Sequence, residues 1–541
     1  MANIMSLKNL RNKPSRNGFD LSCKRNFTGK PGELLPTGSW EILPGDVAMI
    51  DLKSLTRTAP LNTAANARIR EYYDFYFVPY QLLWNKANTV LTQMYDNPQH
   101  ATSLDPTLPF TLKDEMPYIT CEQIVTYLST NAHNYKNYFG YDRGILSCKL
   151  LEYLGYGDFM TAADGGEDWD ITPMQANLNL NIFNLLAYQK IYADYYRDSQ
   201  WERVSPSTFN VDYLGVNNSM NLDISDESFA ENYNFFDLRY CNWQKDLFHG
   251  VLPRQQYGEA SFVEVDSDYT GGFSILALRQ AEFLQKWKEI AQSGNKDYKE
   301  QIEKHWNVSV GDAYSEMCEY IGGFDSTISI NEVINNNITG DNNAKIAGKG
   351  IGVSNGQLRF ESNGRYGVLM CIYHALPLLD YTTSFVLPMN TRIHATDYAI
   401  PEFDRIGMQN VPLVHLSNPA NGSLPANTIL GYAPRYIDYK TSCDFSVGEY
   451  RYSLSNWLMS YDDESVYSSL SVKEDNNVPP GSTDPANNRL TKYPFFKVNP
   501  NSVNPIFSVE ADETTTTDNL WVSAFFDIKM VRNLDVDGLP Y

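Results

Sequence analysis

The sequence has few of the residues that usually build disulfide frameworks and metal sites. Only seven cysteines and seven histidines occur in 541 residues. The cysteines are odd in number and form no CxxC pair, which argues against a disulfide framework or a structural zinc site and favours reduced thiols. No HExxH motif occurs either, so we expect no metal and no cofactor. The cysteines are Cys23, Cys121, Cys148, Cys241, Cys318, Cys371 and Cys443.

Long apolar runs are also missing. The longest, residues 368–379, contains His374 and Pro377 and is too short to cross a bilayer. The first 18 residues contain no apolar core of the kind that secretory signal peptides carry. We therefore expect no membrane insertion, and a cytosolic setting in which the thiols stay reduced.

No motif identifies a catalytic site. Residues 352–356 match the string GxSxG, which in hydrolases places a serine nucleophile between a strand and a helix. Here the string lies in an Asn- and Gly-rich stretch, residues 334–356, which predicts a loop instead. The 65 acidic residues provide many carboxylate pairs of the kind used in glycoside hydrolysis, but nothing in the sequence singles one out. We predict that the protein is not an enzyme.

Positive charge is scarce outside the N-terminus. Residues 1–30 hold seven basic side chains and one acidic side chain, for a net charge of +6, whereas the whole chain has a net charge of −22. A basic segment on an acidic body is typical of polyanion binding, although a solvated tail is the alternative. We therefore predict a basic arm over residues 1–38 that binds a polyanion. The candidate contact residues are Lys8, Arg11, Lys13, Arg16, Lys24 and Arg25.

Aromatic residues are abundant, at 13% of the chain, and seven of them lie within residues 70–84. The alternation there predicts a strand that ends at Pro79, which has no N–H for a central ladder, followed by a short helical run. Both faces of this strand carry rings, so the rings either fill a core or stack on a ligand, and we favour the core. The candidate core or interface rings are Tyr73, Phe75, Phe77, Tyr80 and Trp84.

The rest of the chain indicates one large, mainly β domain over residues 39–541. Strand patterns occur at residues 39–55, 366–379, 433–447 and 520–534, and helical spacing occurs at residues 181–197 and 275–292. Widely spaced strands with long connections predict an antiparallel sandwich or jelly roll that carries a few inserted α-helices. We place the large insertions at about residues 96–240 and 275–356.

Several segments, in order along the chain, resemble the major capsid protein of microviruses, the small icosahedral single-stranded DNA phages. The likeness is to the gokushovirus branch. The segments are LPGDVAMIDLKSLTRTAPLNTAANAR (43–68), YDFYFVPYQLLW (73–84), AYQKIYADYYRDSQ (187–200), NWQKDLFHGVLPRQQYG (242–258), residues 276–308, EYIGGFDSTISINEV (319–333), HATDYAIPEFDRIGMQ (394–409) and GYAPRYIDYK (431–440).

This resemblance implies a viral jelly roll and self-assembly, through pentamers, into the smallest (T=1) icosahedral shell around a circular single-stranded DNA genome. It implies no catalysis. The implied partners are an internal scaffolding protein, a DNA-pilot protein, a small basic DNA-associated protein and a host-cell surface receptor. The implied location is the virion, assembled in the bacterial host cytoplasm, with the basic arm facing the packaged DNA.

One departure from this family concerns a surface feature. Relatives in this branch carry a long insertion, after the segment that matches residues 252–258, which builds a protrusion at the threefold axes. Here only fourteen residues, 259–272, occupy that place. We therefore predict a shell without a tall threefold protrusion from this segment. The alternative function is a carbohydrate-binding or carbohydrate-active β-sandwich protein that uses exposed rings.

Overall fold

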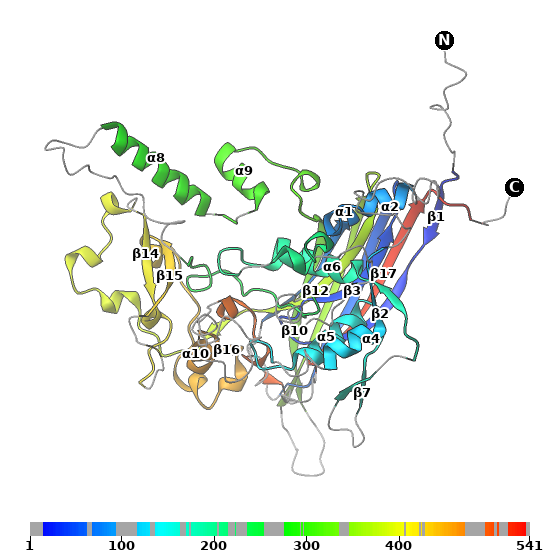
Figure 1. The fold of residues 1–541 in the computed structure, drawn as a ribbon. Coiled ribbons are helices and arrows are strands. Elements are labelled where there is room, and N and C mark those ends of the chain that lie inside the picture. Colours follow the sequence, from blue (N-terminus) through cyan, green and yellow to red (C-terminus); the bar gives the residue numbers. More distant parts are fainter. Residues whose placement is uncertain are drawn as a thin grey trace, which may run out of the picture.

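The fold is built around one large antiparallel sheet (Figure 1). The computed structural model describes residues 14–61, 68–93, 116–129, 136–162, 169–172, 175–202, 205–214, 222, 235–253, 275–292, 294–295, 297–334, 346–404, 407–420, 424, 428–470, 493–502, 506–507 and 518–536. No helix among these residues is long and apolar enough to cross a membrane.

Nine strands form this main sheet, in the order β1-β17-β4-β11-β10-β5-β12-β3, and β2 pairs with β17 beside β1. The two chain ends therefore meet in the sheet, because β1 and β2 both lie along the last strand. The strands are β1 (Asn17–Asp20), β2 (Cys23–Gly29), β3 (Leu35–Ile42), β4 (Val47–Thr58), β5 (Ile69–Pro79), β10 (Glu319–Ile334), β11 (Ile346–Glu361), β12 (Gly367–Pro377) and β17 (Leu520–Arg532).

Strand β10 joins the two halves of the main sheet. Its residues 319–328 pair with β5, and its residues 329–334 pair with β11. A bulge at Gly322, where φ is +146°, bends the strand within the part that pairs with β5. A Cβ atom at this position would lie 2.7 Å from Leu358 Cδ2, so only glycine fits here without displacement of the leucine.

The two halves of the sheet face each other across an apolar interior. Phe75 on β5 and Phe526 on β17 lie far apart in strand order, yet their ring centroids are 6.3 Å apart. Trp40 on β3 contacts the same Phe526 ring at 5.4 Å, and Phe27 on β2 contacts Tyr373 on β12 at 5.1 Å. The sheet thus folds over on itself and encloses the core between its halves.

The aromatic strand β5 is covered on both faces. It ends at Pro79, as predicted, and the helices α1 (Tyr80–Leu83) and α2 (Ala87–Gln93) follow it. The outer face packs on α6 (Phe183–Ile191) and on the π-helical turn η3 (Tyr192–Tyr196), with Tyr76 and Tyr195 at 4.9 Å. The five candidate rings are all buried, with exposed fractions of 0% for Tyr73, Phe75 and Phe77, 7% for Tyr80 and 4% for Trp84.

Two long insertions carry the helices and the short strands. The first, between β5 and β10, holds α1, α2, α4 (Cys121–Tyr127), α5 (Arg143–Tyr153), α6, η3, α8 (Ile275–Gln292) and α9 (Tyr298–Trp306). It also holds β6 (Tyr118–Thr120), β7 (Met160–Ala162), β8 (Trp169–Ile171), β9 (Asn179–Asn181), η4 (Pro206–Thr208), η5 (Val211–Tyr213) and η6 (Asp312–Tyr314). In Figure 1, α8 and α9 project from the side of the molecule away from β1.

The second insertion, between β12 and β17, consists mostly of short elements. It holds β13 (Asp380–Tyr381), β14 (Met408–Pro412), β15 (Ile429–Pro434), β16 (Ser460–Tyr461) and α10 (Asp463–Leu470). Single 3-10 turns lie between them, at Pro388–Thr391, Ala395–Asp397, Pro401–Phe403, Leu413–His415, Ile437–Tyr439, Gly448–Arg451, Ser455–Trp457, Tyr493–Phe496 and Pro500–Ser502.

The mainly β fold with inserted helices is confirmed, whereas the jelly-roll connectivity stays a prediction. Three local expectations need correction. Residues 17–29 are strands of the main sheet rather than part of a free arm. Residues 346–356 belong to β11, which pairs with β4 and β10, so neither the loop at 334–356 nor an insertion that reaches residue 356 is correct. The strand expected over 433–447 ends at Pro434.

Candidate nucleic-acid interface

The candidate DNA-contact residues fall into three groups. Lys8, Arg11 and Lys13 lie outside the described residues. Arg16 is exposed just before β1. Lys24 and Arg25 lie on β2, which pairs along β17, so the structure builds these two cations into the edge of the main sheet.

The strands next to Lys24 place further cations and rings on the same exposed face of the sheet. In the register of β2, β17 and β4, Lys24 lies opposite Phe525, and Phe525 lies opposite Lys53. Four residues further along β2, Thr28 lies opposite Trp521, and Trp521 opposite Arg57. Because directly paired residues in adjacent strands point to the same face, these side chains form one surface. We call it the basic–aromatic face: Lys24, Lys53, Arg57, Trp521 and Phe525.

The alternation of β4 and β17 produces this face. In both strands every second side chain enters the core, including Ile50 and Leu52 on β4 and Ile528 on β17. The intervening side chains therefore point to solvent. Trp521 is 46% exposed and Phe525 is 40% exposed, so both rings are available to a ligand on this side.

The cations of the basic–aromatic face lie beyond ion-pair distance from the carboxylates that the structure describes. Among the described residues, Lys24, Lys53 and Arg57 make no ion pair. By contrast, Lys529 at the far end of β17 lies 3.7 Å from Asp527, and Arg359 on β11 lies 2.5 Å from Glu361. Unpaired cations beside exposed rings suit a nucleic-acid strand, because phosphates pair with the cations while bases stack on the rings.

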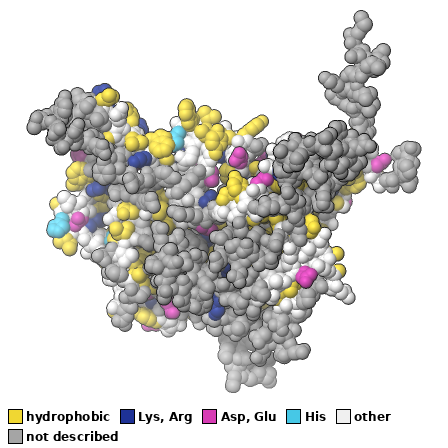
Figure 2. Space-filling model, in the orientation of Figure 1, with side chains coloured by type: hydrophobic (Ala, Val, Ile, Leu, Met, Phe, Trp, Pro, Cys, Tyr) yellow, Lys and Arg dark blue, Asp and Glu magenta, His cyan; other side chains and the backbone are white. Residues whose placement is uncertain are grey.

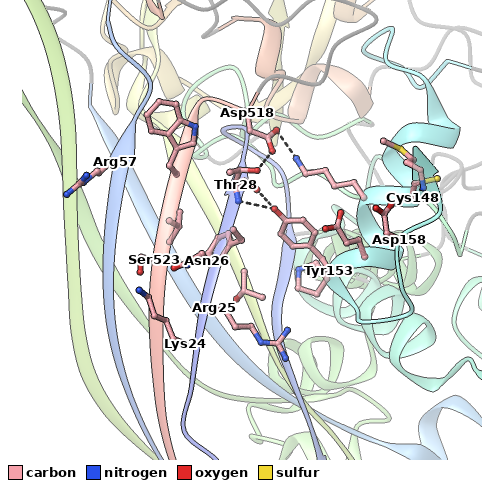
Figure 3. Close-up of a pocket in the computed structure, with 18 of the residues that line it drawn as sticks. Lys24, Arg25, Asn26, Thr28, Arg57, Cys148, Tyr153, Asp158, Asp518 and Ser523 are labelled. Carbon is pink, nitrogen blue, oxygen red and sulfur yellow. Dashed lines mark hydrogen bonds and ion pairs between the residues drawn. The ribbon is translucent and has the colours of Figure 1, made fainter. Parts of the chain in front are cut away.

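A pocket of about 1000 Å³ opens beside this face, between β2 and α5 (Figure 3). Lys24 and Arg25 lie at the lower end of the pocket in Figure 3, and Asp518 lies at the upper end. Strand residues Arg57, Trp521 and Ser523 line it on one side and α5 lines it on the other. The candidate cations of β2 thus border a hollow as well as an open surface.

The wall of the pocket is held by a buried ion network. Lys149 Nζ lies 2.7 Å from Glu33 Oε2 and 2.9 Å from Asp518 Oδ1. Burial alone lowers the pKa of Lys149, but these two carboxylates raise it above its usual value, so the ammonium group stays charged. The charges of Lys149, Glu33 and Asp518 therefore satisfy one another and fasten α5 to both ends of the sheet.

Hydrogen bonds of Tyr153 close one end of the free edge of β2. The Thr28 N–H donates to the Tyr153 hydroxyl oxygen at 3.0 Å, and the same hydroxyl donates to the Thr28 carbonyl oxygen. Capping of an edge strand in this way protects it from pairing with another chain at that point.

The pocket lacks features of a catalytic centre. Its thiol, Cys148, is 2% exposed, and burial raises its pKa to about 12, so it stays protonated near neutral pH. The GxSxG string lies inside strand β11, without the strand-to-helix turn that exposes a serine nucleophile. No group of three His, Cys, Asp or Glu side chains within the described ranges could hold a metal ion.

Sequence reasoning found Lys24 and Arg25 but missed Lys53, Arg57, Trp521 and Phe525. The alternation within residues 47–58 and 520–529 does predict which of their side chains share a face. What it cannot supply is the pairing of β4 with β17, whose residues Arg57 and Trp521 lie opposite each other although more than 460 positions separate them.

Comparison with known proteins gives one family match. Residues 9–141 and 259–537, more than half of the chain, match the model of a family described as "Capsid protein (F protein)". All nine strands of the main sheet lie within these ranges. The segment between them, residues 142–258, contains α5 and α6 of the first insertion.

Two phage proteins, each named capsid protein VP1, are similar to this chain. The protein of Bdellovibrio phage phiMH2K is 21% identical over 505 residues, which cover 83% of this chain and 84% of that protein. The protein of Chlamydia phage 1 is 25% identical over 207 residues, which cover 37% of this chain. That second match spans only 35% of the Chlamydia phage protein.

Proposed function

Because the chain belongs to the phage capsid protein (F protein) family, we propose that copies of it assemble into a closed icosahedral shell around a circular single-stranded DNA genome. The observation that carries this proposal is the family match, which includes every strand of the main sheet. A shell of identical subunits requires contacts that repeat around symmetry axes and close on themselves.

The basic–aromatic face supports a DNA-facing role for one side of the subunit. The chain as a whole has a net charge of −22 and repels a polyanion at long range. Attraction must therefore come from a local cluster of cations within about 8 Å of the phosphates, the Debye length at physiological salt. Lys24, Lys53 and Arg57 provide such a cluster, and Trp521 and Phe525 add stacking surfaces that accept any base.

The N-terminal cations extend this proposal beyond the sheet. Arg16 precedes β1, and Lys8, Arg11 and Lys13 precede Arg16 in the chain. We assign these four residues to an interior arm that contacts the packaged DNA together with Lys24 and Arg25. Its contacts are to phosphates and therefore independent of base sequence.

The remaining partners follow from the family resemblance alone. We assign an internal scaffolding protein, a DNA-pilot protein and a small basic DNA-associated protein to assembly and packaging, and a host-cell receptor to the outer surface. Assembly is placed in the bacterial host cytoplasm and the mature protein in the virion. The segment expected to lack a threefold protrusion, residues 259–272, lies outside the described residues, so that prediction stands as made.

A carbohydrate-active function has less support. It depended on exposed rings in residues 70–84, and the five candidate rings there are at most 7% exposed. Rings that fill a core are not available to stack on a sugar.

The first experiment tests the shell. The chain is co-expressed with the scaffolding, pilot and DNA-associated proteins of its phage, and the products are imaged by electron microscopy. We expect closed icosahedral particles that contain single-stranded DNA. Isolated monomers only, or open filaments, would contradict the proposal.

The second experiment tests the DNA-facing role. Lys8, Arg11, Lys13, Arg16, Lys24 and Arg25 are replaced together by Gln, and the DNA content of the particles and its release with rising salt are measured. We expect less packaged DNA and a weaker salt dependence. A control variant carries Gln at Arg68, Lys299 and Lys440, three cations that already pair with carboxylates. Equal packaging by the unaltered protein, the six-residue variant and the control variant would rule out this role. An arm located on the outer surface would also rule it out.

A further inference from the structure

The helical hairpin of α8 and α9 exposes an unusual amount of apolar surface. In α8 only Ala291 is buried among the described side chains, and α9 has no buried side chain. We define the hairpin surface by Leu276, Phe283, Trp287, Trp306, Val308 and Tyr314, whose exposed fractions run from 52% to 84%. These large side chains are far more exposed than the rings on β5.

Three of these side chains share one face of α8. Phe283 and Trp287 are four residues apart and so share a face of α8, and Leu276, seven residues before Phe283, continues that face. Trp287 stacks on His305 of α9, with ring centroids 5.4 Å apart. Figure 2 shows hydrophobic side chains on the upper side of this view, over α9 and beside α8.

Local contacts set the position of the hairpin. Gln301 Nε2 donates to the carbonyl oxygens of Ala291 and Asn295, which fastens α9 to the end of α8. Gln200 Nε2, at the end of the loop after η3, donates to the Gly294 carbonyl oxygen at 2.6 Å. The hairpin is therefore held at its turn, while the apolar face of α8 lies open.

The exposed area is large for an isolated subunit. With about 200 Å² for a fully exposed ring, Phe283, Trp287, Trp306 and Tyr314 together expose about 550 Å². The largest apolar patch on a typical monomeric protein is about 300–600 Å² and is often functional, so this area lies at the upper end of that range, and each partner in a standard interface buries about 800 Å². These four rings alone supply more than half of such an interface. An amphipathic helix also gains most of its stability from the packing of its apolar face, which here requires a partner.

The charge of the hairpin indicates what kind of partner covers it. Residues 275–314 contain six basic and six acidic side chains, whereas the whole chain has a net charge of −22. A second copy of the chain can approach a neutral surface without the repulsion that its acidic body meets elsewhere. A DNA strand, by contrast, finds no excess of positive charge here.

We propose that the hairpin surface packs against a neighbouring copy of this chain in the assembled shell, with Phe283, Trp287 and Trp306 buried at the contact. This inference rests on the proposed function, because it needs a shell in which copies meet. It goes further by naming the surface through which they meet.

Cysteine labelling in intact particles tests this contact. A Phe283→Cys variant is assembled, and its labelling by a maleimide is compared between particles and dissociated subunits by mass spectrometry of the peptide that contains position 283. We expect labelling in particles to fall at least tenfold. Equal labelling in particles and subunits would overturn the inference, as would protection that appears only when a different protein is added to complete particles.

A second variant measures the contribution of the contact to assembly. Trp287→Ser should reduce the yield of particles at least tenfold at equal subunit concentration, while the circular dichroism of the subunit stays unchanged. The matched control is Tyr398→Ser, which removes a ring of the same 52% exposure from outside both the hairpin surface and the basic–aromatic face and should leave the yield of shells unchanged. Equal yields from both variants would overturn the inference. Failure of the unaltered chain to form any particle would overturn the proposed function and this inference together, whereas particles that are fully labelled at position 283 would overturn the inference alone.

Discussion

Strands β5 and β17 belong to the same sheet and are both rich in rings, yet they expose very different amounts of them. On β5 the inner face meets β17 and the outer face meets α6 and η3, so Phe75, Phe77 and Tyr76 are at most 3% exposed. On β17 only one face is covered, and Trp521 and Phe525 remain 46% and 40% exposed. The difference is produced by the insertions and not by the strands themselves.

This comparison shows how to distinguish a core ring from a ligand-binding ring. A high local density of rings marks β5, and that density reflects a strand with two buried faces. On β17 the rings alternate with core residues, and directly beside them lie cations of neighbouring strands that make no ion pair within the described part of the chain. The neighbours across the sheet, more than the number of rings, distinguish the surface that we propose to bind DNA.

The largest effect is expected from the core side of this comparison. Phe75→Ala removes a fully buried ring that contacts Phe324, Phe526 and Trp40, and should lower the free energy of unfolding of the subunit by about 3–5 kcal/mol. The measurement is urea unfolding of dissociated subunits, followed by tryptophan fluorescence. Phe525→Ala is the control and should cost less than about 1 kcal/mol, since its ring is already partly in water. Similar losses in the two variants would show that the faces do not differ as described.

The covered outer face of β5 should also make stability depend on pH. His374 stacks on Tyr72 and is buried, and burial lowers its pKa to about 3 from an ordinary value of 6.5. The unfolded chain therefore binds a proton that the folded chain excludes between these values, so this contribution to stability is complete above pH 6.5 and decreases as the pH falls towards 3. We expect a loss of about 2–3 kcal/mol between pH 6.5 and pH 4.5.

Comparison with a His374→Gln variant isolates this contribution. Asp74 Oδ2 lies 3.9 Å from His374 Nδ1, and burial raises the pKa of Asp74, so its own contribution has the opposite sign: it is present at low pH and is lost as the pH rises through that raised pKa. The variant retains Asp74 but lacks the imidazole. Its unfolding free energy should fall less steeply from pH 6.5 to pH 4.5, and an unchanged pH profile would refute this role of His374.

On the exposed face of β17, Trp521 should contribute strongly to DNA binding and little to the stability of the fold. Loss of one stacking ring typically costs about 1–3 kcal/mol of binding free energy per base. Trp521→Ala should therefore weaken the binding of an oligothymidine strand to subunits by roughly 5- to 150-fold, measured by fluorescence anisotropy. The control is Trp306→Ala, which removes a more exposed ring from the neutral hairpin surface and should leave DNA binding unchanged. Equal affinities of the two variants would place the DNA elsewhere.

The smallest effect concerns the salt dependence of DNA binding. Each phosphate contact to a single strand contributes about 0.7 to the slope of log affinity against log salt concentration. Gln at both Lys53 and Arg57 should therefore lower that slope by about 1.4. Gln at Arg68 and Lys440, which already pair with carboxylates, should leave the slope unchanged. If both double variants have the same slope, the basic–aromatic face does not bind phosphates.

Sequence patterns predicted the elements in which local chemistry and tertiary packing agree. Pro79 ends β5 because it cannot donate to a ladder, and the predicted helix over 275–292 coincides with α8. Strand β2 was missed because Lys24, Asn26 and Thr28 on its exposed face make it resemble a polar arm. Strand β11 was missed because its Gly- and Asn-rich half has no apolar alternation, and it forms a strand through its pairing with β4.

The candidate site was only half predictable for a related reason. Lys24 and Arg25 stood out as part of a basic N-terminal segment. Arg57 and Trp521 become neighbours only through the pairing of β4 with the last strand of the chain. A single sequence contains the alternation that selects the exposed face of each strand, but not the partner of each strand.

The continuous strand β10 also has a mechanical consequence. Because residues 319–328 pair with one half of the sheet and residues 329–334 with the other, pulling the halves apart would require hydrogen bonds along the same strand to break together. A subunit that bears the load of packed DNA should therefore move as one rigid body. Strain in the shell should then concentrate at the contacts between subunits. Rupture of the particle would then begin at those contacts, before the strands of any subunit separate.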